Sequence, residues 1–237
     1  LLRQKTLEEM KTDFTNNITH ELKTPIAVAY AASDALLNFD TGTDPAKREQ
    51  YLRICQEQLR RLSGLVEQIL GMSMERRKTF RLHPETFPPE EVIMPLIEQH
   101  KLKADKPTGI TLRIEPENLT VYADRTHFGN IVSNLIDNAI KYSPGEAQVE
   151  IKCCTENGWF ILSVSDQGIG IPHDKQRHVF DKFYRVPTGN LHDVKGYGLG
   201  LYYVKTLTEK HGGTVEMKSE PGKGSEFTIK LRMKNEK

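Results

Sequence analysis

Residues 14–26 read FTNNITHELKTPI, and this stretch decides how the first part of the chain folds. Apolar side chains recur at Ile18, Leu22 and Ile26, a spacing that predicts one packed face of a helix. A helix advances about 100° per residue, so His20 lies roughly 200° from both Ile18 and Leu22. We therefore expect the helix to expose His20 to solvent, where a second domain can reach it.

A second helix is expected after the polar break at residues 38–45. Asp44 and Pro45 suit the N-cap and the first turn of a helix. Apolar residues then recur at alternating steps of three and four, the heptad spacing of helices that pack along a seam. They are Leu52, Cys55, Leu59, Leu62, Val66 and Ile69. Two antiparallel helices cannot bury such seams alone, so the pattern favours a dimer that forms a four-helix bundle.

The rest of the chain mixes strands and helices. Helices are expected near residues 90–103, 125–142 and 199–211, and strands near residues 110–114, 119–122, 149–154 and 159–165, with a possible edge strand in residues 80–89. The chain ends in a predicted hairpin of residues 214–219 and 225–231. Helices that alternate with antiparallel strands indicate a two-layer α/β sandwich. The predicted class is α+β, with a helical domain over residues 1–80 and a sandwich over residues 81–237.

The composition limits the partners and the setting. A chain of 237 residues is long enough for two domains that each bury a core. The formal net charge of +1 gives no electrostatic reason to expect nucleic acid or a membrane surface as a partner. No run of about 18 apolar residues exists, so these residues are not expected to cross a membrane. The cysteines lack metal-type spacing and suit a reducing cytosol. The chain begins inside a helical pattern, which indicates a piece of a longer protein.

Two clusters in the second part of the chain have the chemistry of a nucleotide site. On one predicted helix, Asn134, Asn138 and Lys141 share a face, and amide oxygens suit Mg²⁺ while a lysine suits phosphate. At the end of a predicted strand, Asp166 can accept a hydrogen bond from an exocyclic amine, and the glycines after it allow a ligand to approach the backbone. An Asp–Gly turn also occurs in ordinary hairpins, so neither cluster decides the function by itself.

Two further clusters follow along the chain. Residues 180–185 read FDKFYR, and residues 195–201 read KGYGLGL at the start of a helix whose N-terminal amides could hold phosphate. The spacing Gly-x-Gly-x-Gly, without a βαβ unit around it, differs from a dinucleotide fingerprint. The sequence contains no Walker A motif and no Ser/Thr-kinase catalytic loop. Each lysine or arginine could be an ordinary surface charge, but the clusters in this order need a joint explanation.

In this order the clusters resemble the motifs of two-component sensor histidine kinases, and the resemblance covers essentially the whole chain. The His20 segment resembles the H box, residues 134–142 the N box, residues 166–170 the G1 box, residues 180–183 the F box and residues 196–200 the G2 box. Gly213 and the turn at residues 222–225 resemble the closing motif of the ATP-binding domain. The resemblance implies a dimeric hairpin that bears the histidine, followed by an ATP-binding sandwich of the histidine kinase, gyrase and chaperone type.

The resemblance implies a role for each matching residue. His20 would accept the γ-phosphate of ATP, with Glu21 as a base or as an orienting partner of the ring. Asn138 would bind Mg²⁺ with Asn134 nearby, and Asp166 would recognise adenine. Four residues would neutralise the triphosphate: Lys141, Tyr142, Arg185 and Lys195. The other implied nucleotide-binding residues are Gly168, Gly170, Ile171, Phe183, Gly196, Tyr197, Gly198, Leu199, Gly200 and Ser225.

The family also implies partners and a second activity. The phosphoryl group would pass from His20 to an aspartate of a response-regulator receiver domain, the chain would act as a homodimer, and residues 184–194 would form a mobile lid. Thr24 lies one turn after His20 on the same face, where relatives with the pattern His-Glu-x-x-Thr place the water that dephosphorylates the regulator. A phosphatase role for Thr24 is therefore expected, although an ordinary exposed threonine is the plain alternative. The full-length protein is expected to be anchored in the inner or plasma membrane, with this part in the cytoplasm.

Two rival functions stay open. ATPases of the gyrase, chaperone and mismatch-repair types share the nucleotide fold and hydrolyse ATP, but they place a glutamate where this chain has Asn134. An amide is a poor base for activating water, so transfer to His20 is favoured over an ATP-driven clamp. The other rival is a non-catalytic scaffold that binds receiver domains, and the intact Asn138 and Asp166 argue against it.

Overall fold

The computed structural model describes residues 2–38, 44–73, 81–186 and 198–234. The chain divides into two compact units, Leu1–Arg77 and Lys78–Lys237. Within the described ranges, no helix is both long enough and apolar enough to span a membrane.

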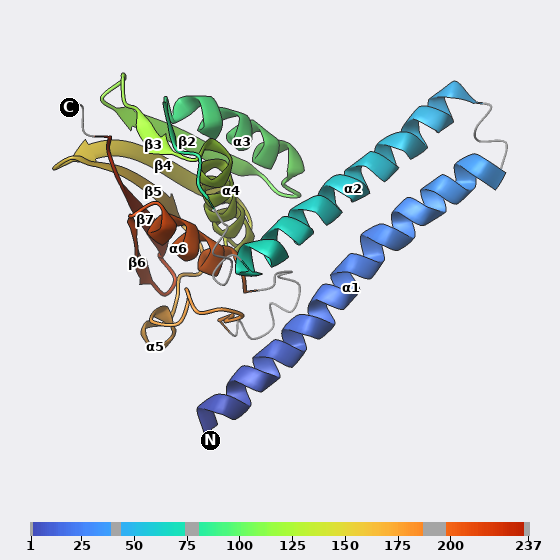
Figure 1. The fold of residues 1–237 in the computed structure, drawn as a ribbon, viewed down its shortest axis with the longest axis horizontal. Helices are drawn as coiled ribbons and strands as arrows, with labels where there is room; N and C mark the ends of the chain where they lie inside the picture. The colour runs from blue at the N-terminus through green and yellow to red at the C-terminus, as the bar shows by residue number, and fades with distance from the viewer. Residues whose placement is uncertain (1, 39–43, 74–80, 187–197, 235–237) are drawn as a thin grey trace. The chain divides into compact units, whose positions relative to one another are not determined.

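The first unit is a hairpin of two helices, α1 (Leu2–Asn38) and α2 (Pro45–Ser73) (Figure 1). Asp44 caps α2, because its carboxylate accepts a hydrogen bond from the backbone N–H of Ala46 at 3.0 Å. The Cys55 thiol donates to the carbonyl oxygen of Ala29 at 3.5 Å, so the two helices pack directly against each other. Both expected helices and the expected cap are confirmed.

Much apolar surface of this hairpin stays exposed within one chain. Leu52 and Leu59 of the expected seam are 54% and 60% exposed. Ile26 on the expected packed face of α1 is also 53% exposed, so the hairpin by itself does not bury it. Within the hairpin, each helix has one partner helix, which covers only one of its sides. The side chain of Ile69 lies outside the described residues. His20 is exposed, as its helical position predicts.

The second unit contains a five-stranded sheet in the order β2-β4-β5-β7-β6. Its strands are β2 (Thr108–Glu115), β4 (Ala147–Glu156), β5 (Trp159–Asp166), β6 (Thr214–Glu220) and β7 (Gly224–Arg232). Strands β2 and β4 pair in parallel, with Ile110 opposite Val149, whereas the other neighbours are antiparallel. The expectation of antiparallel strands is therefore wrong at one edge. The chain passes through a helix between β2 and β4 and enters both strands from the same end of the sheet, as parallel pairing requires.

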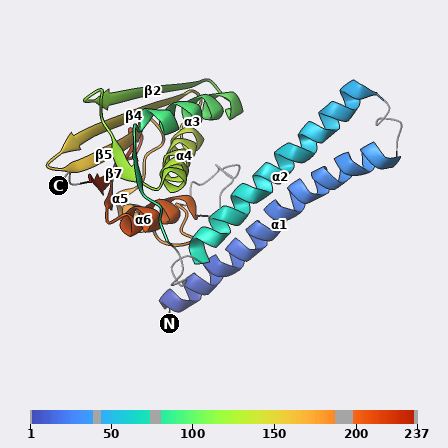
Figure 2. The same cartoon turned by 45° about the horizontal axis from the view of Figure 1, so that its top comes forward.

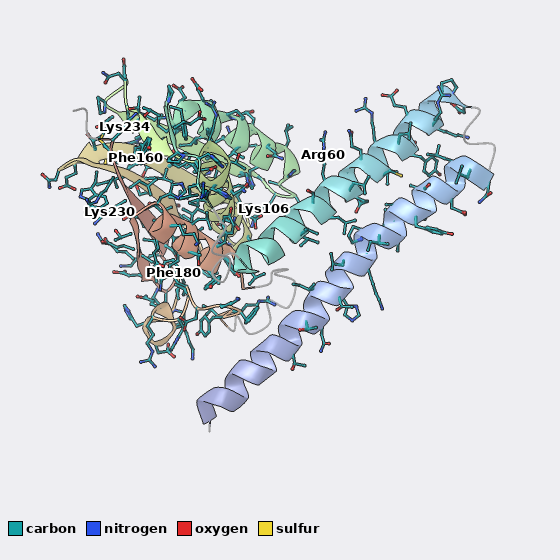
Figure 3. All side chains as sticks on the ribbon, viewed as in Figure 1. Arg60, Lys106, Phe160, Phe180, Lys230 and Lys234 are labelled. Atoms are coloured by element: carbon teal, nitrogen blue, oxygen red, sulfur yellow. The ribbon has the colours of Figure 1, made fainter. Side chains whose placement is uncertain are left out.

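Three helices cover one face of this sheet (Figure 2). They are α3 (Glu90–Lys103), α4 (Arg125–Lys141) and α6 (Gly200–Lys210). A small second sheet pairs β1 (Glu85–Phe87) with β3 (Val121–Ala123), and the short helix α5 (His173–Gln176) follows β5 without having been predicted. The core between the layers includes Phe128 and Ile136 from α4 and Ile151 and Phe160 from the sheet, all at most 1% exposed. Figure 3 labels Phe160 among the side chains of this unit.

His211 joins the end of α6 to the start of α4. Its Nδ1 lies 2.7 Å from the carbonyl oxygen of Leu207 and donates to it, because a carbonyl can only accept. Its Nε2 accepts a hydrogen bond from the backbone N–H of Asp124 at 3.0 Å. The ring is thus bonded in its neutral form, and burial lowers the pKa of His211.

Acid should destabilise the second unit through His211. A histidine whose pKa is lower in the folded state than in the unfolded state contributes its full stability at pH values above the unfolded pKa of about 6.5. This contribution is lost as the pH falls from the unfolded pKa toward the folded pKa. Urea unfolding at pH 7.5 and at pH 5.5 should show a smaller loss of unfolding free energy for His211→Gln than for the unmodified chain. The exposed His83, changed to Gln, is the control that should behave as the unmodified chain does. Equal losses in all three proteins would contradict this assignment.

Candidate functional site

The C-terminal half of α4 presents two asparagines toward the start of α6. Asn134 and Asn138 lie one turn apart and are half-buried, while Leu135 beside them is fully buried in the core. The amide nitrogen of Asn134 donates to the carbonyl oxygen of Asn130 at 2.8 Å. A Cβ added at Gly200 would lie 2.8 Å from the amide oxygen of Asn134. The fold therefore brings the predicted N box against the predicted G2 box.

Asp166 ends β5 with its carboxylate held at one oxygen. Oδ1 accepts hydrogen bonds from the backbone N–H of Gly168 at 2.8 Å and from that of Ser225 at 3.2 Å. Within the part of the chain that the structure describes, Oδ2 makes no hydrogen bond. Burial raises the pKa of the Asp166 carboxyl group, and the two backbone donors oppose that rise. A carboxylate fixed in this way has one acceptor oxygen available for an amino group of a ligand.

The loop that follows β5 packs against the end of α4 and the turn between β6 and β7. Ile169 donates its N–H to the carbonyl oxygen of Tyr142 at 3.0 Å and accepts from the N–H of Gly222 at 2.8 Å. A Cβ on Gly168 would lie 2.5 Å from the same Tyr142 oxygen. Gly170 has a φ of 66°, in the left-handed region that favours glycine. The glycines of the G1 box therefore permit a close backbone contact that a side chain would prevent.

Residues on either side of segment 187–197 meet in the fold. Phe183 donates its N–H to the carbonyl oxygen of Gly198 at 3.1 Å. Gly198 has a φ of 66°, and a Cβ there would lie 2.7 Å from the carbonyl carbon of Phe183. Leu199 is buried directly before α6. Lys195, Gly196, Tyr197 and most of the expected lid lie outside the described residues.

Charged side chains also gather near the end of α4. Lys141 and Tyr142 are half-buried there. Burial raises the pKa of the Tyr142 hydroxyl, and the positive charge of Arg185 opposes that rise. Arg185 therefore interacts electrostatically with Tyr142. Of the four residues expected to neutralise phosphate, these three therefore belong to one region of the second unit.

The residues expected from the H box lie in the first unit. His20 and Thr24 are exposed on α1, one turn apart. The Thr24 hydroxyl donates to the carbonyl oxygen of His20 at 3.2 Å, a common bond for a threonine within a helix. The side chain of Glu21 lies outside the described residues. The described residues that were expected to bind nucleotide thus lie within one unit, and His20 and Thr24 lie on the other.

The sequence patterns did not point to two residues that hold the loop after β5. Ser219 on β6 accepts a hydrogen bond through Oγ from the N–H of Ile171 at 2.8 Å. Gln176 on α5 donates through Nε2 to the carbonyl oxygen of the same Ile171 at 2.9 Å. A helix as short as α5 has no hydrophobic period, and the only local signal for it is Pro172 followed by Asp174 in the first turn.

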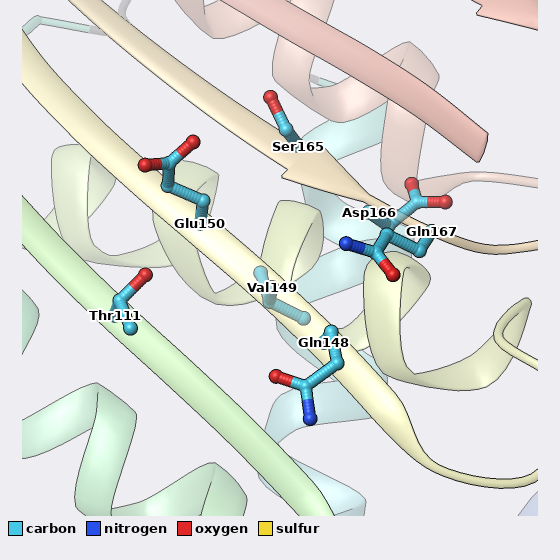
Figure 4. A pocket seen from close by; sticks show the side chains of 7 residues that line it. All are labelled: Thr111, Gln148, Val149, Glu150, Ser165, Asp166 and Gln167. Atoms are coloured by element: carbon cyan, nitrogen blue, oxygen red, sulfur yellow. The ribbon is translucent and has the colours of Figure 1, made fainter. Parts of the chain in front are cut away.

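A polar hollow on the sheet also touches Asp166 (Figure 4). It is lined by Thr111, Gln148, Val149, Glu150, Ser165, Asp166 and Gln167. Neither Asn138 nor Gly200 lines it. The candidate site is therefore assigned to the residues of α4, the loop after β5 and the start of α6, and not to this hollow.

Comparisons with known proteins identify the family. Residues 10–77 match the His Kinase A (phospho-acceptor) domain, and residues 123–235 match the histidine kinase-, DNA gyrase B-, and HSP90-like ATPase. The chain belongs to the two-component sensor histidine kinases. The predicted family and the predicted fold class, a helical histidine-bearing region followed by a mixed α/β ATPase domain, are confirmed.

Relatives and solved structures agree with this family. Sensor protein RprX of Bacteroides fragilis is 41% identical over 98% of this chain and 45% of its own length. The chain thus spans less than half the length of RprX. The Acinetobacter baumannii histidine kinase AdeS is 26% identical with a TM-score of 0.59, over 91% of this chain and 98% of AdeS. ShkA, at 21% identity, shares the fold with a TM-score of 0.68 over 94% of this chain and 45% of ShkA.

Proposed function

We propose that this chain is the core of an ATP-dependent protein-histidine kinase. It phosphorylates His20 and passes the phosphoryl group to an aspartate of a response-regulator receiver domain. The observation that carries this proposal is the state of Asp166, whose Oδ1 is fixed by two backbone donors while Oδ2 stays available beside the N box. The solved structure of ShkA is a complex with AMPPNP, which supports a nucleotide ligand for the same fold here.

The residues present fit an adenine nucleotide with Mg²⁺. Asp166 Oδ2 would accept a hydrogen bond from the exocyclic amine of adenine, and the N-terminal N–H groups of α6 at Gly200 would bind phosphate. Among the described residues, no group of three His, Cys, Asp or Glu side chains could hold a metal ion by itself. The amide oxygen of Asn138 would therefore hold Mg²⁺ together with phosphate oxygens. When bound, Mg²⁺ supplies neutralisation of the phosphate charge, and Lys141 and Arg185 add to it.

His20 carries out the chemical step. The unprotonated ring nitrogen forms a bond to the γ-phosphorus as the bond from that phosphorus to the β,γ-bridging oxygen breaks, and ADP leaves. The proton on the other ring nitrogen passes to Glu21 or to water. The exposed position of His20 supports this role, because a buried ring could not reach a nucleotide on another unit.

A homodimer is part of the same proposal. Leu52, Leu59 and Val66 are each at least 45% exposed along one heptad seam of α2. A second copy of the hairpin would remove these side chains from water in a four-helix bundle. We also propose that the longer protein is anchored in a membrane with this part in the cytoplasm, which is supported by the kinship with sensor proteins that extend beyond the matched region.

The test is incubation of the chain with Mg²⁺ and ATP labelled at the γ-phosphate. The chain should acquire label that is lost in acid and stable in alkali, the behaviour of a phosphoramidate. A label that survives acid but is lost in alkali would indicate a phosphate ester of serine or threonine and contradict the assignment of histidine. A chain that binds ATP and acquires no label at all would also contradict it.

Replacing Thr24 with alanine should separate two activities of the first unit. We expect dephosphorylation of the receiver domain that accepts the phosphoryl group to slow by at least about tenfold, because the hydroxyl that places the attacking water is lost. Autophosphorylation should stay near the level of the unmodified chain. The matched control is Thr19→Ala, since Thr19 is exposed and its hydroxyl likewise bonds a carbonyl four residues earlier, at Thr15 and 2.8 Å. Equal loss of both activities in Thr24→Ala would refute the phosphatase role.

A further inference from the structure

The side chain of Gln176 bridges two backbone segments of the second unit. Its Nε2 donates one hydrogen bond to the carbonyl oxygen of Ile171 at 2.9 Å and another to the carbonyl oxygen of Ser219 at 2.8 Å. Ile171 lies in the loop after β5, and Ser219 lies on the edge strand β6. A primary amide carries two N–H groups on one nitrogen, so Gln176 can serve both acceptors at once.

Ile171 is held at both of its backbone polar groups. Besides the bond from Gln176, its N–H donates to Ser219 Oγ at 2.8 Å. Ser219 Oγ lies in turn 2.9 Å from the carbonyl oxygen of Gly224 and 3.0 Å from the hydroxyl of Ser225. The far end of the loop after β5 is therefore tied to the same β6–β7 hairpin that supplies one backbone donor to Asp166.

This arrangement connects Gln176 to the geometry of the Asp166 carboxylate. Asp166 Oδ1 accepts one hydrogen bond from the loop, at Gly168, and one from the hairpin, at Ser225. The two donors stay in register only while loop and hairpin keep their relative position. Gln176 adds a direct side-chain bridge between loop and hairpin to the bonds from Gly222 to Ile169 and from Ile171 to Ser219, so it helps to fix where Oδ2 points without touching a ligand itself.

We infer that Gln176 is a positioning residue for recognition of the nucleotide base. The inference rests on the proposed function, in which Asp166 Oδ2 accepts from adenine. Loss of the bridge lets the loop shift relative to the hairpin, which misaligns the acceptor for the base. The phosphate-binding groups on α4 and α6 do not depend on this bridge, so binding of the triphosphate part is unchanged.

The test compares two ligands, ATP and inorganic triphosphate, each with Mg²⁺, by calorimetry and competition. Gln176→Met keeps the length of the side chain and removes both donors, and Gln176→Glu puts a carboxylate against two carbonyl oxygens. We expect both variants to raise the Kd for ATP about tenfold, because one hydrogen bond to the base is then misaligned. The Kd for triphosphate should stay the same. The KM for ATP should rise and kcat at saturating ATP should be kept.

The matched control is Gln99→Met, which makes the same substitution at an exposed glutamine of α3, outside the candidate site. It should leave the Kd values for both ligands as they are in the unmodified chain. Equal weakening of ATP and triphosphate in the Gln176 variants, or no weakening of ATP, would overturn the inference. Thermal unfolding identifies a variant that fails to fold. Gln176→Asn, which keeps the donors on a side chain too short to bridge both carbonyl oxygens, then replaces it, and it should likewise raise the Kd for ATP and leave the Kd for triphosphate unchanged. Failure of the unmodified chain to bind ATP would instead refute the proposed function.

Discussion

Replacing His20 with glutamine should reduce the incorporation of labelled phosphate to background. Glutamine keeps a polar side chain of similar reach but has no nitrogen lone pair that can attack phosphorus. His20 is exposed on α1, so the substitution should leave folding and the affinity for ATP unchanged within about twofold. The measurements are incorporation of γ-phosphate, ATP binding and thermal unfolding of the same preparation.

The histidine substitution also separates the kinase from an ATP-hydrolysing clamp. The control is His83→Gln, which changes another exposed histidine and should keep full labelling. A clamp would release phosphate to water at the same rate in the unmodified chain and in His20→Gln. Unchanged ATP turnover in His20→Gln, or continued labelling of it, would therefore show that His20 is not the phosphoacceptor.

Replacing Asp166 with asparagine should separate nucleotide binding from stability. Asparagine can keep the two bonds from the N–H groups of Gly168 and Ser225, because its amide oxygen can take the place of Oδ1. It places an amide donor where Oδ2 accepted, and this donor opposes the amine of adenine. Loss of a hydrogen bond to a charged acceptor predicts ATP binding weaker by roughly tenfold to a hundredfold.

Asp166→Asn should weaken ATP binding, but it should not lower the stability of the protein without ligand. Burial raises the pKa of Asp166, so the stability that its protonated form contributes is present below the unfolded pKa and is lost as the pH rises through the folded pKa. At pH 7 the charged carboxylate is a cost, and Asp166→Asn should unfold at the same or a higher temperature. Asp105→Asn, at an exposed position, is the control that should change neither property. A less stable Asp166→Asn protein with normal ATP affinity would contradict both expectations.

Long elements with a strong hydrophobic period are confirmed where the sequence predicts them. Helix α4 buries Phe128, Val132 and Leu135 on one face, and β5 alternates a buried Phe160 with partly exposed neighbours. The parallel pairing of β2 with β4 was not predicted, because a strand shows the same two-residue alternation whichever way its neighbour runs. Helix α5 was missed because four residues are too few to show a period.

Part of the candidate site could likewise be predicted from the sequence, and part could not. The types and order of His20, Asn138 and Asp166 are visible along the chain and indicate the family by themselves. The bridges made by Gln176 were not visible, because its partners are a main-chain carbonyl in a loop and another on a distant strand. Any residue offers a carbonyl, so no residue type marks such a partner.

By itself, the sequence determined two helices with an exposed histidine and an α/β region with the chemistry of a nucleotide site. It did so because burial and reactivity follow from side-chain type and local spacing. Only the tertiary structure decided which backbone groups hold Asp166 and which glycines must lack a side chain. The bond from Ser225 to Asp166 joins residues 59 positions apart, and such contacts arise only when the sheet, its hairpin and the covering helices pack together.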